Sequence, residues 1–182
     1  VVTPDGKSII FSANRNKDWE YDTRNSEIYD VSVQDGTIRT LTDRNGPDES
    51  PTLSPDGGRI AYVGFDDAYQ FYQLRRLYVM NRDGSNSRLV SSALDRDVQA
   101  PVWSEDGRGI FFQYDDEGQT KIAHITLDGE VQDLAESLGG MSLGRPYSDG
   151  EYSVSPNGWY AFTQSRPDAP SDVAIGHRGA AA

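Results

Sequence analysis

The stretch SPDGGRIAYV, residues 54–63, joins a tight-turn signal to a short apolar run, and this combination recurs along the chain. Its first four residues have counterparts at a constant spacing, with steps of 51, 50 and 51 residues between successive copies. The four copies are Thr3-Pro4-Asp5-Gly6, Ser54-Pro55-Asp56-Gly57, Ser104-Glu105-Asp106-Gly107 and Ser155-Pro156-Asn157-Gly158. A fixed period of this length is the signature of a repeat architecture, in which each repeat is one supersecondary unit.

Each copy of the turn precedes a short run of β-branched and aromatic residues, which predicts a β-strand. The runs are Ile9-Ile10-Phe11, Ile60-Ala61-Tyr62-Val63, Ile110-Phe111-Phe112 and Tyr160-Ala161-Phe162. A second turn signal follows in every repeat, at Asp35-Gly36, Asp83-Gly84, Asp128-Gly129 and Arg178-Gly179. Since glycine accepts the positive φ of a tight hairpin without a Cβ clash, these turns indicate antiparallel pairing. The predicted order of elements in one repeat is therefore strand, turn, strand, long loop, strand, turn, strand.

Four antiparallel strands in about 50 residues make one blade of a β-propeller. We therefore predict an all-β fold, a partial β-propeller over residues 1–182, with repeats at approximately 1–49, 50–98, 99–150 and 151–182. The first repeat begins inside its first strand and the fourth ends after its third, so about three and a half four-stranded blades are expected. A helical solenoid is excluded by the Gly, Pro and β-branched content, and a parallel β-helix would use much shorter coils.

Composition and charge exclude several classes of function. The chain of 182 residues has no cysteine, which rules out disulfides, thiolate metal sites and cysteine catalysis. No apolar run approaches the roughly 20 residues of a transmembrane helix, so no membrane span is expected. The formal net charge of −12 opposes binding to a phosphate backbone, and the one adjacent basic pair, Arg75-Arg76, has no basic cluster around it. Nucleic acid is therefore not an expected partner.

Residues 140–144, GMSLG, have the Gly-x-Ser-x-Gly spacing of a serine-hydrolase nucleophile elbow. That elbow requires a strand before the serine and a helix after it. Ser142 instead lies between the last strand of the third repeat and the first strand of the fourth, and the residues after it, 145–150, are rich in turn formers. We therefore interpret Ser142 as a loop hydroxyl and expect no catalytic residue in this chain.

Other chemistry-bearing residues also favour structural roles. The only histidines, His124 and His177, have no carboxylate at ligand spacing, so solvent-facing strand and turn positions are predicted for them. The adjacent acids in residues 115–117 lack the alternating oxygen ligands of a calcium loop and predict a solvated hairpin. Neither a metal nor another cofactor is expected.

Four aromatic residues crowd the loop between the second and third strands of the second repeat. Exposed aromatics can mark a binding surface, but they can equally fold down and cover the blade edge, and the sequence leaves both alternatives open. The residues of this candidate partner-facing loop are Phe65, Tyr69, Phe71 and Tyr72.

The repeat units resemble the WD-like propeller repeats of the prolyl oligopeptidase family, especially its acylaminoacyl-peptidase and dipeptidyl-peptidase branches. The residues that carry the resemblance are Pro51-Thr52-Leu53-Ser54-Pro55-Asp56-Gly57 and Pro101-Val102-Trp103-Ser104-Glu105-Asp106-Gly107. The periplasmic Tol-system propeller has a similar repeat. The segment 161–173, where a serine- and proline-rich loop leads into an Asp-Val strand, is similar to the late propeller of acylaminoacyl peptidases and favours the peptidases.

This resemblance implies a non-catalytic propeller that gates or binds peptide substrates for a catalytic α/β-hydrolase domain, and that domain is absent from these residues. The parent protein would then be a serine peptidase. Dipeptidyl peptidases also use a propeller Glu-Glu pair for the substrate amino terminus; Asp48-Glu49 does not match it, so no binding residue carries over. The alternative is a stand-alone protein-binding propeller resembling that of the Tol system. A periplasmic or secreted location and a cytoplasmic one both remain open.

Two further expectations follow from the strand order. The Asp-Gly turns should lie on one rim, and the long loops, residues 14–26, 65–75, 113–120 and 165–171, on the other, where a partner would bind. An open arc of blades cannot close its own ring, so its unpaired edges predict either a longer parent protein or self-association.

Overall fold

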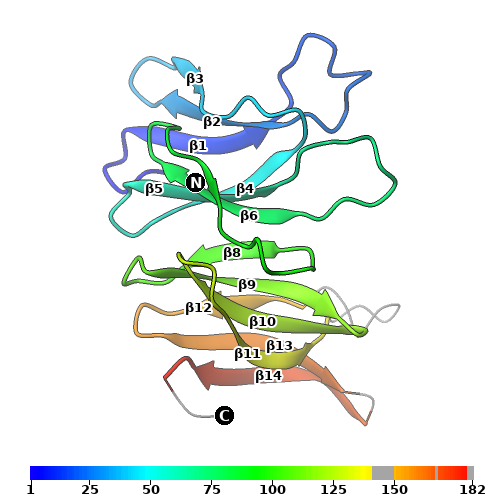
Figure 1. Cartoon of the computed structure of the whole chain (residues 1–182). Helices are drawn as coiled ribbons and strands as arrows, with labels where there is room; N and C mark the ends of the chain where they lie inside the picture. Colours follow the sequence, from blue (N-terminus) through cyan, green and yellow to red (C-terminus); the bar gives the residue numbers. More distant parts are fainter. Residues whose placement is uncertain (141–149, 167, 180–182) are drawn as a thin grey trace.

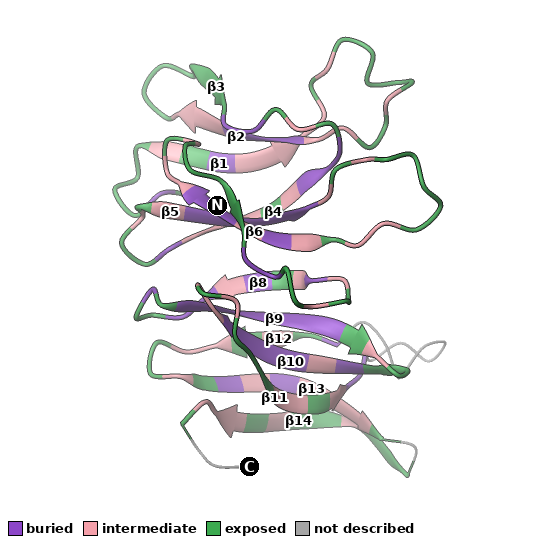
Figure 2. Ribbon diagram, in the orientation of Figure 1, coloured by how far each residue is buried: buried purple, intermediate pink, exposed green. Residues whose placement is uncertain are grey.

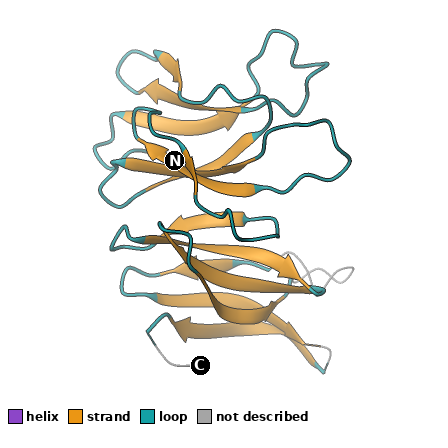
Figure 3. Cartoon of the chain, in the orientation of Figure 1, coloured by secondary structure: helices purple, strands orange, loops and turns teal. Residues whose placement is uncertain are grey.

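The computed structural model describes residues 1–140, 150–166 and 168–179 of the chain. Within these ranges every regular element is a β-strand, as Figure 3 shows, and the all-β prediction is confirmed. The strands are β1 (Ser8–Ala13), β2 (Glu27–Ser32), β3 (Ile38–Thr40), β4 (Asp48–Leu53), β5 (Arg59–Gly64), β6 (Arg76–Asn81), β7 (Arg88–Leu89), β8 (Gln99–Trp103), β9 (Gly109–Asp116), β10 (Gln119–Thr126), β11 (Val131–Leu138), β12 (Tyr152–Val154), β13 (Trp159–Arg166) and β14 (Ala169–His177). No helix in the described ranges is long and apolar enough to cross a membrane.

The strands form antiparallel meanders that stack from the first repeat at the top of Figure 1 to the fourth at the bottom. The first sheet is β1-β2-β3, with a single bridge from Val2 to Ile9 in place of an earlier strand. The second is the complete blade β4-β5-β6-β7, and the third repeat forms β8 to β11. Strands β12 to β14 form the fourth, so the chain is a partial propeller, as predicted.

The third and fourth repeats are joined into one continuous sheet, which the repeat pattern did not predict. Leu138, at the end of β11, pairs with Gln164 of β13. The pairing of β11 with β10 contains register shifts near Ile122, and such irregularities bend a strand away from its partner. The end of β11 thereby reaches the neighbouring repeat.

The predicted long loops at 113–120 and 165–171 are wrong. Strand β9 continues to Asp116 and β10 starts at Gln119, so only Glu117 and Gly118 form the turn. Both have positive φ, 50° and 79°, as a tight two-residue hairpin turn requires. In the fourth repeat β13 runs to Arg166 and β14 begins at Ala169. The solvated hairpin predicted for the acids at 115–117 is confirmed.

The core lies between the blades, in three apolar clusters that appear as the purple strand segments of Figure 2. One cluster, with Ile10, Ile28 and Ile60, joins the first and second repeats. The next cluster, between the second and third, contains Trp103, whose Nε1 donates to Thr52 O at 3.1 Å. The third joins the last two repeats through aromatic residues of β9 and β13. Because each repeat buries its faces only against its neighbours, stability accumulates along the stack.

The Ser or Thr that begins the recurring turn makes similar hydrogen bonds within each copy. The Ser or Thr hydroxyl donates to the side chain two residues later, at 2.6 Å in the first three copies and 2.5 Å in the fourth. In the first three copies the same hydroxyl also accepts the amide N–H five residues later. The Thr/Ser-x-Asp-Gly spacing is therefore a turn-forming unit.

Candidate partner-binding rim

Two long loops project from one rim of the stacked sheets, on the right in Figure 1. Residues 14–26 join β1 to β2, and residues 65–75 join β5 to β6. We call these two loops, together with the inter-blade segment 43–47, the long-loop rim. The recurring Asp-Gly turns lie on the opposite side of the sheets in the same view.

Side-chain amides hold the first loop in place. Asn14 Nδ2 donates to Asp22 O at 2.6 Å, and Asn16 Nδ2 donates to Asn25 O at 2.9 Å. Asn side chains commonly replace missing backbone partners in irregular segments in this way. The loop therefore has a defined path although it contains no strand.

Asp67 organises the second loop. Its Oδ1 accepts hydrogen bonds from Tyr69 N and Gln73 Nε2, both at 2.7 Å, and Gln73 Oε1 accepts from Ala68 N at 2.6 Å. The hydrogen bond from Gln73, followed by that from Tyr69, holds the pKa of Asp67 below its ordinary value. Tyr69 has a φ of 54°, in the left-handed region that side chains other than Gly, Asn and Asp seldom adopt, and the Asp67 carboxylate stabilises that turn.

The inter-blade segment 43–47 ties the two loops together. Gly46 N donates to Asn25 Oδ1 at 3.1 Å in the first loop, while Asn45 exchanges backbone and side-chain hydrogen bonds with Asp67 in the second. A Cβ on Gly46 would lie 2.1 Å from Phe65 O, so only glycine allows this close approach. The long-loop rim is consequently one connected surface.

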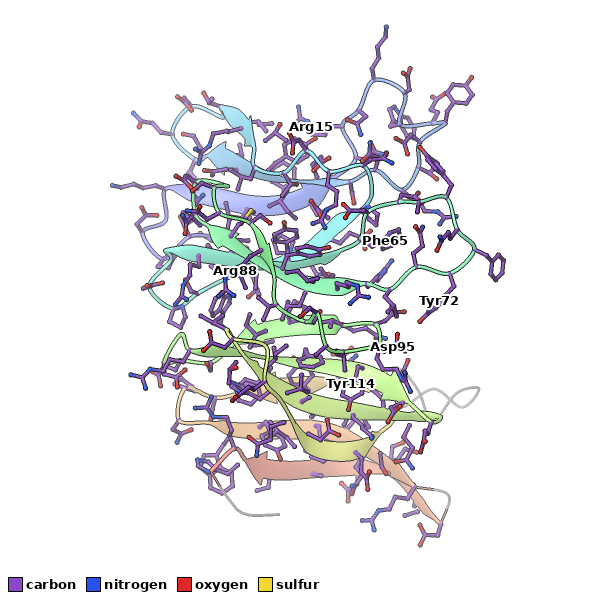
Figure 4. All side chains as sticks on the ribbon, viewed as in Figure 1. Arg15, Phe65, Tyr72, Arg88, Asp95 and Tyr114 are labelled. Atoms are coloured by element: carbon purple, nitrogen blue, oxygen red, sulfur yellow. The ribbon has the colours of Figure 1, made fainter. Side chains whose placement is uncertain are left out.

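The four predicted aromatic residues do not share one environment. Tyr69, Phe71 and Tyr72 are exposed, with exposed fractions of 83%, 107% and 65%, whereas Phe65 is half-buried at the base of the loop. Figure 4 shows the Phe65 label close to the strands and the Tyr72 label near the outer edge. Three of the four side chains therefore project into solvent and do not cover the blade edge. Their contact with a partner stays a prediction.

Two further aromatic residues, which the sequence pattern did not single out, lie on the same rim. Trp19 and Tyr21 of the first loop have exposed fractions of 55% and 90%. The signal was present in residues 17–22, where aromatic and charged residues alternate in a segment between two strands. The same criterion that selected the second loop would have selected the first.

Two hollows border the second loop. The interloop hollow, about 500 Å³, lies between the two long loops and is lined by residues that include Tyr21, Tyr69 and Phe71. The blade-edge hollow, about 530 Å³, lies on the other side of the loop, between it and the strands β6 and β7. Phe65 and Tyr72 line the blade-edge hollow. The exposed aromatics thus border cavities that could admit side chains of another molecule.

Behind the rim lies a buried polar network. The Thr42 hydroxyl donates to Glu27, and Arg44 Nη2 contacts Asp48 Oδ1 at 2.6 Å while its guanidinium lies 3.8 Å from the Tyr78 ring centroid. Burial raises the pKa of Glu27 to about 7 and that of Asp48 to about 6, the latter against the attraction of Arg44. These carboxyl groups can therefore hold a proton near neutral pH.

Asp48 and Glu49, which do not match the Glu-Glu pair of dipeptidyl peptidases, lie in different surroundings. Asp48 is fully buried against Arg44, whereas Glu49 makes a salt bridge of 3.3 Å with Arg75. Their side chains point to different surroundings because successive residues of a strand face opposite sides.

The candidate catalytic residues are not brought together. Ser142 and the rest of 141–149 lie outside the described residues. The prediction that His124 faces solvent is wrong: it is buried in β10 against Phe111, with Nε2 2.8 Å from Arg178 Nη1. Burial lowers its pKa to about 4, with a smaller contribution from Arg178. Both faces of β10 pack against neighbouring blades. The sequence pattern of one strand does not show that its second face is also covered.

His177 is half-buried at the end of β14, not in a turn, with its ring 4.9 Å from that of Trp159.

The acids of the third hairpin form ion pairs, since Asp116 contacts Arg96 and Lys121 at 2.9 Å each. Within the described ranges no cluster of three or more His, Asp or Glu side chains is placed to hold a metal ion.

Comparison with known proteins identifies the repeats. The family described as the dipeptidyl peptidase IV (DPP IV) N-terminal region matches residues 3–133. Dipeptidyl-peptidase 5 of Porphyromonas gingivalis is 28% identical over 138 residues, which cover 74% of this chain and 20% of the relative. Dipeptidyl-peptidase 5 of Trichophyton schoenleinii is 30% identical over 145 residues, 72% of this chain and 19% of the relative. The chain thus spans about a fifth of these relatives.

Among solved structures, TolB from Acinetobacter baumannii superposes with a TM-score of 0.71 at 19% identity, over 96% of this chain and 40% of that one. At this identity the similarity shows the propeller fold alone. The family match, in contrast, covers more than half of the chain and agrees with the resemblance carried by the repeat. This chain therefore belongs to the dipeptidyl peptidase IV N-terminal region family, a propeller domain of the prolyl oligopeptidase type.

Proposed function

We propose that this chain is the non-catalytic propeller portion of a dipeptidyl-peptidase-type serine peptidase. In this role the long-loop rim binds or admits peptides on their way to a hydrolase domain of the same protein. The family match and the dipeptidyl-peptidase relatives support the parent class. The gating role is supported by one observation, the exposure of Trp19, Tyr21, Tyr69, Phe71 and Tyr72 on a single rim.

Aromatic rings exposed to water gain free energy when a partner covers them. Three aromatic side chains of the second loop project from a turn that its own hydrogen bonds hold in place. Fully burying one such ring contributes roughly 1.5–3 kcal/mol, so a partner that covers several of them gains affinity without reorganising the loop. Such a surface suits transient contact with a peptide.

A second candidate is a stand-alone protein-binding propeller like that of the Tol system. The observation in its favour is the superposition on TolB over nearly the whole chain. In this alternative the same aromatic rim binds a folded protein, and no peptidase activity accompanies it.

The test uses the complete product of the gene that encodes this chain. We expect it to release dipeptides from peptide substrates, and we expect the double variant Tyr69→Ala/Phe71→Ala to raise KM about three- to tenfold while kcat changes less than twofold. The matched control is Asp35→Ala/Asp128→Ala on the opposite rim, which should leave KM unchanged. A complete gene product without peptidase activity would favour the binding propeller, and an unchanged KM in the loop variant would remove the gating role.

A further inference from the structure

The two hollows that flank the second long loop differ in chemistry. The interloop hollow combines the rings of Tyr21, Tyr69 and Phe71 with the carboxylates of Asp22 and Asp67. Aromatic faces and carboxylates both attract a cation, and together they form a site that a guanidinium or ammonium group can fill.

The blade-edge hollow has aliphatic side chains in its lining, which the interloop hollow lacks. Phe65, Leu74, Tyr78 and Leu89 contribute to its lining, and Tyr72 stands at its side. These residues can contact an aliphatic or aromatic side chain of a ligand, because such contacts remove apolar surface from water.

The charges around the two hollows are unequal. Four carboxylates line them, Asp22, Asp66, Asp67 and Asp95, against two guanidinium groups. Asp66 pairs with Arg44 at 3.8 Å and Asp95 with Arg96 at 3.9 Å, and both carboxylate side chains remain strongly exposed, at 82% and 89%. The whole chain also carries a formal net charge of −12. The complementary ligand is therefore cationic.

We propose that the long-loop rim binds an extended basic peptide segment, with a Lys or Arg side chain in the interloop hollow and an apolar side chain in the blade-edge hollow. The inference deepens the proposed function, on which it rests for the role of this rim. It specifies the chemistry of the occupant, which neither the family match nor the relatives state.

Arg24 makes the proposal sharply testable, because it stands on the wall of the interloop hollow and is exposed. A bound cation would lie beside this positive group, so Arg24 weakens the site. Removing its charge should strengthen binding, whereas removing the charge of Asp22 should weaken it. Opposite effects from two charged residues of one loop are not expected of a merely structural role.

The probe is a fluorescein-labelled decapeptide of alternating Arg and Leu, titrated with this chain while fluorescence anisotropy is recorded. We expect saturable binding that weakens about tenfold in Tyr69→Ala/Phe71→Ala and about threefold in Asp22→Asn, and that strengthens about threefold in Arg24→Gln. Matched peptides with Glu for Arg, or Ser for Leu, should bind at least tenfold more weakly. Circular dichroism of each variant verifies that the fold is unchanged.

The control for general charge attraction is Asp128→Asn on the turn rim, which should leave the dissociation constant unchanged. The proposal would be overturned by any of three results: Asp128→Asn lowers the affinity as much as Asp22→Asn does, Arg24→Gln does not raise the affinity, or the Arg-Leu peptide does not bind. Its failure is distinguishable from that of the proposed function. A raised KM in the loop variant of the complete protein, without binding of the basic peptide, would leave the gating role standing and remove only the basic occupant.

Discussion

At the scale of single residues, the buried network around Thr42 contains the most unusual side chains. Glu27 has an exposed fraction of 6% and Asp48 of 0%, and both carboxyl groups contact Thr42 or Arg44. Burial opposes ionisation of both groups, and Arg44 compensates only part of that cost for Asp48. Folding therefore stabilises the protonated carboxyl group of Glu27 relative to the unfolded chain.

We expect Glu27→Gln to stabilise the chain in a pH-dependent manner. The ordinary pKa of Glu27 is 4.5 and burial raises it to about 7, so between these values the folded chain keeps a proton that the unfolded chain has lost. The free energy of unfolding of the wild type then falls as pH rises through this window and levels off above it. Gln keeps the hydrogen bond to Thr42 without titrating, so the stability advantage of the variant grows to roughly 3 kcal/mol at pH 8.

Urea unfolding at pH 4.5 and at pH 8, followed by tryptophan fluorescence, measures this difference. The two proteins should have nearly the same midpoint at pH 4.5 and separate at pH 8. An advantage of equal size at both pH values would show that Glu27 is not the titrating group.

At the scale of elements, the recurring turn accounts for the repeat. In the second repeat the Ser54 hydroxyl donates to Asp56 and accepts the Arg59 N–H at 2.9 Å, and Ser54 is 1% exposed. The residue at the fourth position is always glycine because its φ is positive, between 62° and 83° in the four copies. The four-residue turn thus sets the start of the following strand.

Ser54→Ala should destabilise the chain by about 1–2 kcal/mol, because the Arg59 N–H loses its acceptor, the hydroxyl of the buried Ser54. The matched control is Ser155→Ala in the fourth repeat. Ser155 is only half-buried and its hydroxyl bonds Asn157, so the loss there should be nearer 0.5 kcal/mol. Thermal unfolding compares the two variants, and an equal loss in both would contradict the role assigned to burial.

At the scale of the whole molecule, the stack ends in an apolar face. Val173 and Ile175 of β14 pair with Thr163 and Ala161 of β13, which places the four on one face of the fourth repeat. Val173 and Ile175 are 68% and 72% exposed. Inner blades cover the equivalent faces with a neighbouring repeat, as the three apolar clusters show. This end face therefore has the composition of an interface.

We expect the 182-residue chain on its own to self-associate through this face. Val173→Lys/Ile175→Lys should shift size-exclusion chromatography with light scattering toward the monomer. Val33→Lys, at another exposed apolar position, should not change the mass. A wild-type chain that remains monomeric at high concentration would refute this prediction.

The sequence by itself determined the all-β class, the four repeats and the two turns of each. These features are local, because a tight turn and the strand after it depend on residues within a few positions of each other. The aromatic loop could also be located, since Phe65, Tyr69, Phe71 and Tyr72 fall between two well-marked strands. The first loop also has aromatic residues between two predicted strands, Trp19 and Tyr21.

Only the tertiary structure decided which residues lie together across the repeats. The burial of His124, the network of Glu27 with Asp48, and the connection of the two long loops through Gly46 all join residues of different strands or blades. Such contacts depend on how one blade packs on the next, which the pattern within a strand does not encode. The period of the sequence specifies each blade, and the packing between blades decides burial, pKa and the shape of the rim.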